Sequence, residues 1–365
     1  MKGSSFLSFA ATGAVLAVLA GCADSSSPGP AASQPDLART SAGPTLTPQQ
    51  SGTTNRLQAI SPVNDQVAWA SGVGGTYAVT TDGGTTWKAG VVPGAADLQF
   101  RDVEGQSDQV AYLMAAGSGP RSRIYRTLDG GQSWQLQFTN TDPAAFYDCF
   151  DFWTPNRAIT MSDAVNGVFP VIRTTDGQTW TNIGANLPAA QSGEAAFAAS
   201  GTCVATFGEK HGWIGTGGAA QARILATTDG GNTWAAYGVP IIQGTPSSGV
   251  ITLAFRDRLH GILGGGELAE GEIFTDNVAT SSDGGKTWSL GTRPPFPGSI
   301  YGLDYVKGLG TSVVITGPKG AAWSSDEGGS WTLLPGVKNY WAVAFASPKA
   351  GWLVGTGGRI LKVSF

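Results

Sequence analysis

Residues 80–87 read TTDGGTTW, and close copies follow at 126–134 (RTLDGGQSW), 173–180 (RTTDGQTW), 226–234 (ATTDGGNTW), 280–288 (TSSDGGKTW) and 323–331 (WSSDEGGSW). The closing tryptophans recur about every 50 residues, and each interval has room for several short strand-like segments. A period of this size is typical of a β-propeller, whose blades bury their faces only against one another. The repeat therefore predicts an all-β ring.

The residue types of the repeat favour a structural role. A short carboxylate can accept backbone N–H groups of its own turn, glycine supplies a positive φ, and tryptophan covers the hairpin with a large apolar ring. Chemistry rarely needs six equivalent sites on one ring. We therefore predict that the aspartates are hairpin fasteners and that the third copy, one residue short, makes a tighter turn. These structural aspartates are Asp82, Asp129, Asp176, Asp229, Asp283 and Asp326.

The inner strands of the expected blades predict seven units of four strands each. They are expected to begin near Leu57, Leu98, Phe146, Ala195, Ile251, Tyr301 and Trp341. The last unit supplies three strands before the sequence ends, and a three-stranded blade would leave an open edge. We therefore expect a segment between about Thr45 and Gly52 to supply the missing outer strand and to close the ring.

The repeat resembles the Asp-box, or bacterial neuraminidase repeat, S/T-x-D-x-G-x-T/S-W, at Thr80, Asp82, Gly84, Thr86 and Trp87. The resemblance covers essentially all of residues 56–365 and implies a seven-bladed propeller with Asp-box hairpin turns. Such propellers include sialidases, endoglucanases, sortilin-type receptors, and photosystem II stability and assembly factors. Phrases such as FRDVEGQ (100–106) and TDNVATSSDGG (275–285) look most like a bacterial branch of the last family, whose members often carry labels such as oxidoreductase or glycosyl hydrolase.

The N-terminal part predicts export and lipid anchoring. Residues 1–21 have one lysine and an apolar run that is too short to span a bilayer, and Leu19-Ala20-Gly21-Cys22 resembles a lipobox with Cys22 as the lipid-bearing residue. Residues 22–55 are rich in Ser, Pro and Ala and predict a flexible tether, whose last part is the closing strand, before the propeller at 56–365. We expect the chain on the periplasmic face of a membrane; Ala23 resembles an outer-membrane sorting signal in Gram-negative bacteria.

Composition excludes several classes of function. The net charge is −4 and the basic residues are scattered, so no nucleic-acid partner is expected. The sequence GTGGAA (215–220) matches a dinucleotide pattern, but a strand-like segment follows it, so it predicts a hairpin turn and no cofactor. The two histidines lack convergent carboxylates, and no metal is expected. Cys149 and Cys203 are interpreted as two buried free thiols, with a disulfide as the alternative if their Cα atoms lie within about 7 Å.

A binding site is expected where the loops are unequal. The connections between second and third strands are long in blades two to five, which gathers polar groups on one arc and makes them candidates for binding a ligand or partner. Solvated loop residues without a partner are the alternative. The arc comprises Arg121, Arg123, Asp163, Asn166, Arg223, Glu267, Glu270, Glu272, Asp276 and Asn277. The tripeptides at 100–102 and 255–257 (FRD) are interpreted as turns on the opposite face.

Two functions follow. The first is a non-catalytic binding or assembly scaffold for a protein client or a glycan, similar to photosystem II assembly factors. The alternative is a glycoside hydrolase that uses a pair of carboxylates, Glu194 with Asp148 or Asp276. A sialidase is disfavoured because the F-R-I-P element of that family is absent. The oligomeric state and the client stay open.

Overall fold

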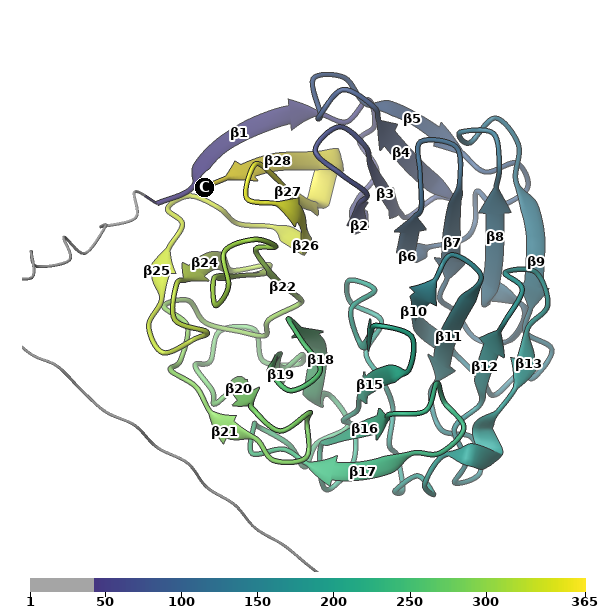
Figure 1. The fold of residues 1–365 in the computed structure, drawn as a ribbon, viewed down its shortest axis with the longest axis vertical. Coiled ribbons are helices and arrows are strands. Elements are labelled where there is room, and N and C mark those ends of the chain that lie inside the picture. The colour runs from purple at the N-terminus through teal and green to yellow at the C-terminus, as the bar shows by residue number, and fades with distance from the viewer. Residues whose placement is uncertain (1–42) are drawn as a thin grey trace, which may run out of the picture. The chain divides into compact units, whose positions relative to one another are not determined.

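The computed structural model describes residues 43–365, and the predicted export signal, Cys22 and most of the predicted tether lie outside this range. The described residues form seven four-stranded antiparallel sheets arranged around a central axis (Figure 1). No helix within residues 43–365 is long and apolar enough to cross a bilayer.

Each blade runs from an inner strand to an outer strand in chain order, except that blade 7 takes its outer strand from the N-terminal part. Blade 1 contains β2 Leu57–Pro62, β3 Ala68–Gly72, β4 Thr76–Thr80 and β5 Lys88–Val91; blade 2 contains β6 Phe100–Gly105, β7 Ala111–Ala115, β8 Arg123–Thr127 and β9 Gln135–Thr139. Blade 3 contains β10 Tyr147–Thr154, β11 Arg157–Ser162, β12 Val171–Thr174 and β13 Thr181–Asn182; blade 4 contains β14 Val204–Phe207, β15 His211–Gly215, β16 Arg223–Thr227 and β17 Ala235–Gly238; blade 5 contains β18 Ser248–Phe255, β19 Gly261–Glu267, β20 Val278–Ser281 and β21 Ser289–Leu290. Blade 6 contains β22 Gly302–Tyr305, β23 Val313–Gly317, β24 Gly320–Ser324 and β25 Thr332–Leu333; blade 7 contains β26 Tyr340–Ser347, β27 Ala350–Gly355, β28 Arg359–Ser364 and β1 Thr45–Gln50. Three short 3-10 helices lie in connections, η1 Gly119–Arg121, η2 Gly184–Asn186 and η3 Thr356–Gly358.

The predicted ring closure is confirmed. Strand β1 pairs antiparallel with β28 over its whole length, from Thr45 opposite Ser364 to Gln50 opposite Arg359. Gln49 then joins two blades, because its Oε1 accepts the indole N–H of Trp87 in blade 1 and of Trp352 in blade 7, each at 3.0 Å. The N-terminal strand thus removes the open edge of blade 7 and ties it to blade 1.

The repeated hairpins owe their shape to hydrogen bonds within a few residues. Asp82 accepts the hydroxyl and the backbone N–H of Thr86 at 2.6 and 2.9 Å, and Thr80 Oγ1 accepts the N–H of Gly84 at 2.9 Å. These donors stabilise the charged carboxylate and lower its pKa to about 2. Gly83 and Gly84 have φ values of 70° and 84°, which an L side chain rarely adopts. The aspartate therefore has a local structural role, as the repeat predicted.

Neighbouring blades are joined by a second set of bonds near the axis. The inner strand of each sheet is an edge strand, whose outward N–H groups need acceptors. Ser61 Oγ accepts the N–H of Gly105, Asp102 that of Phe150, Asp151 that of Thr206, and Asp304 that of Phe345, at 2.6–3.0 Å. In each pair the acceptor lies on one blade and the donor on the next. Apolar residues such as the fully buried Trp69, Trp213 and Trp352 fill the space between sheets.

The inner strand of blade 4 differs from the expectation. It was expected to begin near Ala195, but regular pairing begins at Val204. Ala195 forms only an isolated bridge to Gly217, and residues 196–203 leave the blade. This departure matters for the site.

Candidate functional site

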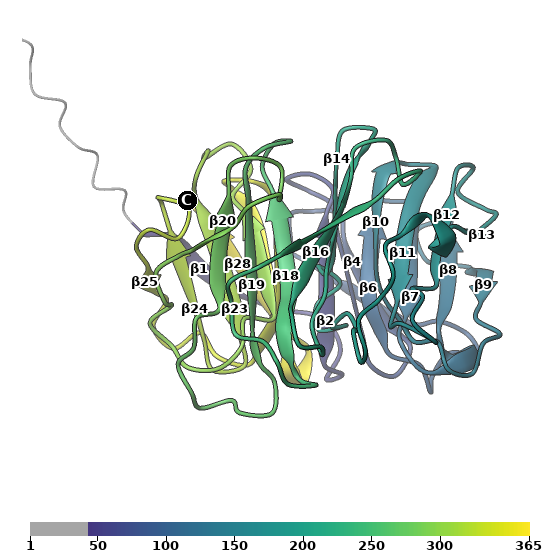
Figure 2. The same cartoon turned by 90° about the horizontal axis from the view of Figure 1, so that it is seen from below.

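The two faces of the ring carry different loops (Figure 2). Because strands within a blade are antiparallel, the hairpins after the inner strand and the repeated Asp/Trp hairpins lie on one face, which we call the motif face. The connections into the inner strands and those between second and third strands lie on the other, which we call the mouth face.

Residues Ala196–Thr202, here named the channel segment, lie across the centre of the ring between these faces. The carbonyl of Ala198 accepts a hydrogen bond from Arg101 of blade 2 at 2.9 Å, and Ser200 donates to the carbonyl of Tyr301, beside β22 of blade 6. The hydroxyl of Thr202 lies 2.7 Å from that of Thr252 in blade 5. One segment thus contacts blades on different sides of the axis.

The segment separates two cavities. One opens on the mouth face, has a volume of about 400 Å³, and is lined by Ala196–Ala199. The other opens on the motif face, has a volume of about 560 Å³, and is lined by Ser200–Thr202. Gly201 has a φ of 80° and faces Asp102 so closely that a Cβ would lie 2.3 Å from its carboxylate, so this crossing needs glycine.

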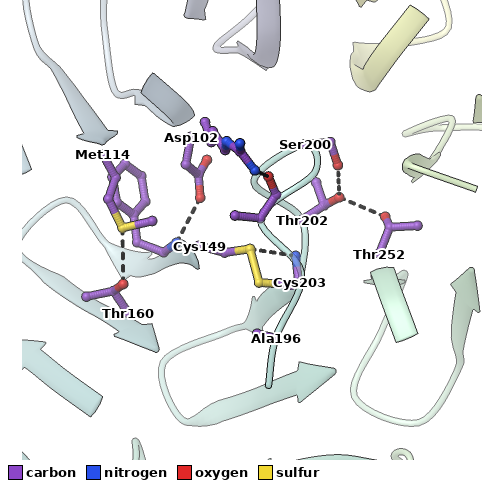
Figure 3. Close-up of a disulfide and its surroundings, with 12 residues drawn as sticks. Asp102, Met114, Cys149, Thr160, Ala196, Ser200, Thr202, Cys203 and Thr252 are labelled. Carbon is purple, nitrogen blue, oxygen red and sulfur yellow. Dashed lines mark hydrogen bonds between the residues drawn. A yellow bond between two sulfur atoms is a disulfide. The ribbon is translucent and has the colours of Figure 1, made fainter. Parts of the chain in front are cut away.

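The interpretation of Cys149 and Cys203 as free thiols was wrong. They form a disulfide with a Cα–Cα distance of 5.8 Å, which joins β10 of blade 3 to the residue that follows the channel segment (Figure 3). The sequence did not reveal this because the two residues become neighbours only when the channel segment returns to the inner edge of blade 4. The disulfide fixes the C-terminal end of that segment.

We call the cavity on the mouth face the mouth pocket. Its wall is aromatic on several sides, with Phe146, Phe197, Tyr301 and Trp341 contributing rings. Tyr301 and Trp341 meet edge to face with ring centroids 4.9 Å apart, and the guanidinium of Arg56 lies 4.4 Å from the Trp341 ring centroid. Arg101, Asp148 and Asp163 supply the charged groups of the lining.

Two carboxyl groups in this pocket share one environment. Asp148 on β10 is 1% exposed, and Asp163, directly after β11, is close enough to hydrogen bond to it. Burial, and then the neighbouring Asp163 carboxylate, raise the pKa of Asp148 well above its ordinary value, and burial also raises the pKa of Asp163. Asp163 Oδ1 accepts the N–H of Ala196 at 3.1 Å, so the pair also holds the start of the channel segment.

The two FRD tripeptides have different positions, contrary to the sequence interpretation. Arg256 and Asp257 do lie at a turn on the motif face, where Asp257 accepts the N–H groups of Leu259 and His260. Arg101 and Asp102 instead lie at the start of β6. Arg101 lines the mouth pocket and is held by Gln99 Oε1 and the Ala198 carbonyl.

Glu194, the central carboxylate of the glycosidase hypothesis, is fully engaged in a buried ion pair. Arg223 donates to its Oε2 at 2.5 Å and its Oε1 at 2.8 Å, while Thr216 and the N–H of Gln191 also donate to it. Glu194 does not line the mouth pocket, which contains Asp148. Asp276 pairs with Arg293 at 2.7 Å on an exposed loop. The structure therefore does not bring the proposed carboxylates to one cavity.

The remaining arc residues are spread over the mouth face rather than gathered. Of the arc, the mouth pocket contains only Asp163. Arg121 donates to the Asp97 carbonyl, Arg123 to the Pro120 carbonyl, Glu267 accepts from Thr245, Asn277 donates to the Gly298 carbonyl, Glu272 pairs with Lys319, and Asn166 and Glu270 are exposed. Most of them therefore hold loops in place.

The cavity on the motif face is rich in carboxyl groups. Burial raises the pKa of Glu104 to about 8 and those of Asp151 and Asp304 to about 6. Asp151 and Asp304 accept backbone N–H groups from the next blade, and Glu104 accepts the Ser61 hydroxyl. Within residues 43–365 no group of three or more His, Cys, Asp or Glu side chains is arranged to hold a metal ion.

Several residues of the mouth pocket have no role predicted from the sequence. Phe146, Tyr301 and Trp341 were identified only as the starts of inner strands, and Arg101 was placed in a turn. The signal available was the recurrence of an aromatic residue at the expected start of the inner strand in blades 3, 6 and 7. In a ring, those positions converge on the axis.

The described residues thus form a seven-bladed propeller with an aromatic-walled cavity on its mouth face, closed at its base by the channel segment. No protein-family profile matches the chain, and no curated protein matches it. Solved structures share the fold. A structure of YCF48 bound to D1 peptide has a TM-score of 0.64 at 18% identity, over 88% of this chain and 97% of that chain. YCF48 from Cyanidioschyzon merolae has a TM-score of 0.60 at 16% identity, over 88% and 99%.

An enzyme also shares this architecture. The GH74 xyloglucanase from Xanthomonas campestris has a TM-score of 0.56 at 13% identity, over 87% of this chain and 53% of that chain. At such identities the likeness shows the fold alone, and this fold supports both peptide binding and glycan chemistry in these neighbours.

Proposed function

We propose that this protein is an exported, lipid-anchored scaffold that binds a segment of a partner protein at the mouth pocket. The observation that carries the proposal is the pocket itself, a cavity of about 400 Å³ with an aromatic wall and charged groups, closed below by the channel segment. Aromatic and arginine side chains around a concave site are typical of protein recognition. The peptide-bound YCF48 structure, which shares the fold, supports a polypeptide ligand.

A site-specific photo-crosslink tests this proposal. A photoreactive amino acid is placed at Phe197, which lines the mouth pocket, or at Leu333, which is 44% exposed on the outer strand β25. In cells of the source organism we expect a discrete protein adduct from position 197 that is absent from position 333 and is lost on Trp341→Ala. Identical adducts at both positions, or none at 197, would refute the scaffold at this face.

The lipid anchor is proposed from Cys22 and the lipobox-like Leu19-Ala20-Gly21 before it. Metabolic labelling with an alkyne fatty acid should label the wild-type chain in the membrane fraction and not a Cys22→Ala variant. Labelling that persists in the variant would contradict the assignment.

Glycoside hydrolysis is the weaker proposal. Asp148 and Asp163 are in hydrogen-bonding range, closer than the separation of about 5 Å or more that flanks a glycosidic bond. Turnover of any substrate in a glycan panel that is abolished by Asp148→Asn and unaffected by Asp108→Asn, on a distant exposed turn, would replace the scaffold proposal with an enzyme.

A further inference from the structure

The mouth pocket contains a buried carboxylate oxygen to which no N–H or hydroxyl group of the described residues donates a hydrogen bond. Asp148 is 1% exposed, no N–H or hydroxyl group of the described residues donates to its Oδ2, and its side-chain partner is the neighbouring carboxyl group of Asp163, which can bond to it only through a shared proton. Buried polar atoms are normally paired, because an unpaired one loses its interaction with water without replacement. Asp148 and Asp163 both line the cavity, so a ligand there can supply a donor in place of the proton that the two carboxyl groups share.

The charges around Asp148 indicate the sign of that ligand. The titratable groups facing it are Asp163 and Arg101, and Arg101 in turn faces Arg56 and Tyr301. When Asp148 and Asp163 share one proton, the pair carries a single negative charge, which Arg101 balances; the second guanidinium, that of Arg56, faces Arg101 and the Trp341 ring rather than either carboxyl group. Loss of the proton leaves one uncompensated negative charge in a buried site, where it is costly. A single positive charge would restore the balance.

The walls indicate what should carry this charge. Phe146, Phe197, Tyr301 and Trp341 offer ring faces and edges to an apolar chain, and aromatic faces also attract cations. Arg101 is not itself the cation that occupies the cavity, since Gln99 and the Ala198 carbonyl hold its guanidinium.

We propose that the mouth pocket binds a primary ammonium or guanidinium group on an apolar stem, which replaces the proton shared by Asp148 and Asp163. The identification of the partner rests on the proposed function: the group is then a lysine or arginine side chain of the bound protein. Binding then releases a proton. Because burial raises the pKa of both carboxyl groups, the affinity for the cation increases as the pH rises through these raised pKa values and decreases as the pH falls below them.

The test uses small probes with the full-length chain in mild detergent. Titration calorimetry compares butylammonium and butylguanidinium with neutral 1-pentanol at pH 5.5, 7 and 8.5, in buffers of different ionisation enthalpy. We expect the cations to bind at least about tenfold more tightly than pentanol at pH 8.5, to weaken by up to about tenfold per pH unit on acidification, and to release about one proton.

Two variants and one control locate the effect. Asp148→Asn and Asp163→Asn should each reduce cation binding at least about tenfold and remove its pH dependence, whereas Asp108→Asn should behave like wild type. If Asp148→Asn fails to fold by circular dichroism, the less buried Asp163→Asn decides. Equal binding of pentanol and butylammonium, or wild-type affinity in a folded Asp163→Asn, would overturn the inference.

The two proposals fail separately. A crosslinked partner at position 197 without cation selectivity leaves the scaffold in place and overturns the cation site. Cation selectivity without a crosslinked partner leaves the cation site in place and overturns the scaffold.

Discussion

Reduction of the Cys149–Cys203 disulfide should destabilise the propeller by about 4 kcal/mol. The bond closes a loop of 54 residues, and the chain-entropy relation for a loop of this length gives about 4 kcal/mol at 25 °C. For the roughly 320 described residues, the unfolding entropy is about 0.7 kcal/mol per kelvin near the melting temperature. The expected decrease in melting temperature is therefore about 6 °C.

The assay is thermal unfolding followed by circular dichroism, with and without dithiothreitol, after mass spectrometry has established complete reduction. Reduced wild type isolates the cross-link, because both sulfur atoms stay in the core. The Cys149→Ala/Cys203→Ala variant should melt at or below the reduced protein, since it also removes buried atoms that are 0% exposed, and it should not respond to dithiothreitol. A reduced wild type that melts within about 1 °C of the oxidised protein would refute the reasoning.

Three further outcomes are expected. Gln49→Ala should lower the free energy of unfolding in urea by about 2 kcal/mol, because two buried indole N–H groups lose their acceptor, whereas Gln49→Glu keeps an acceptor oxygen. Deletion of residues 40–54 should destabilise the propeller more, and an unchanged melting temperature after the deletion would contradict ring closure. The free energy of unfolding should be greatest near pH 4 to 5. It should fall as the pH rises toward 8, because folded Glu104 with a pKa of about 8 retains a proton that the unfolded chain releases, and Glu104→Gln should flatten this alkaline side. It should also fall below pH 4, because Asp82 with a pKa of about 2 stays charged there only when the chain is folded. Glu327→Gly should lower the melting temperature although φ is 58° at this position, because Glu327 binds Arg256 and Tyr305, and an increase would show that backbone strain dominates.

The fold could be predicted because its determinants are close together in the sequence. In each repeated hairpin the aspartate, its hydroxyl partners and the glycines lie within a few residues, as Thr80 to Thr86 show. Their recurrence indicated the propeller, the inner strands gave the number of blades, and the missing outer strand of blade 7 pointed to β1 by elimination. The inner strand of blade 4 was misplaced because the partners of residues 196–202 are Arg101, Tyr301 and Thr252, which are distant in sequence.

The site was predicted less well for a related reason. The sequence named Asp163 among the polar loop residues and Asp148 as a candidate carboxylate, and both line the mouth pocket, but loop polarity could not separate them from Glu194, whose charge is neutralised by Arg223. That pair is separated in sequence, and nothing local distinguishes an ion-paired glutamate from a free one. Arg101 was missed because a charged residue at the start of an inner strand looks the same in sequence as one in a turn.

The channel segment connects the stability of the ring to the shape of the mouth pocket. Between blades 2 and 3, 3 and 4, and 6 and 7, an aspartate accepts an N–H of the next inner strand; between blades 4 and 5 the carbonyl of Thr202 does so, accepting from Leu253 at 2.9 Å. The segment therefore replaces a side-chain acceptor with its own backbone. Because it must hold this bond, the disulfide and the contacts to Arg101 and Tyr301 together, it cannot move aside without weakening the joints between blades. A partner should accordingly bind to a preformed pocket closed at its base, with little of the ordering cost that a mobile loop would add.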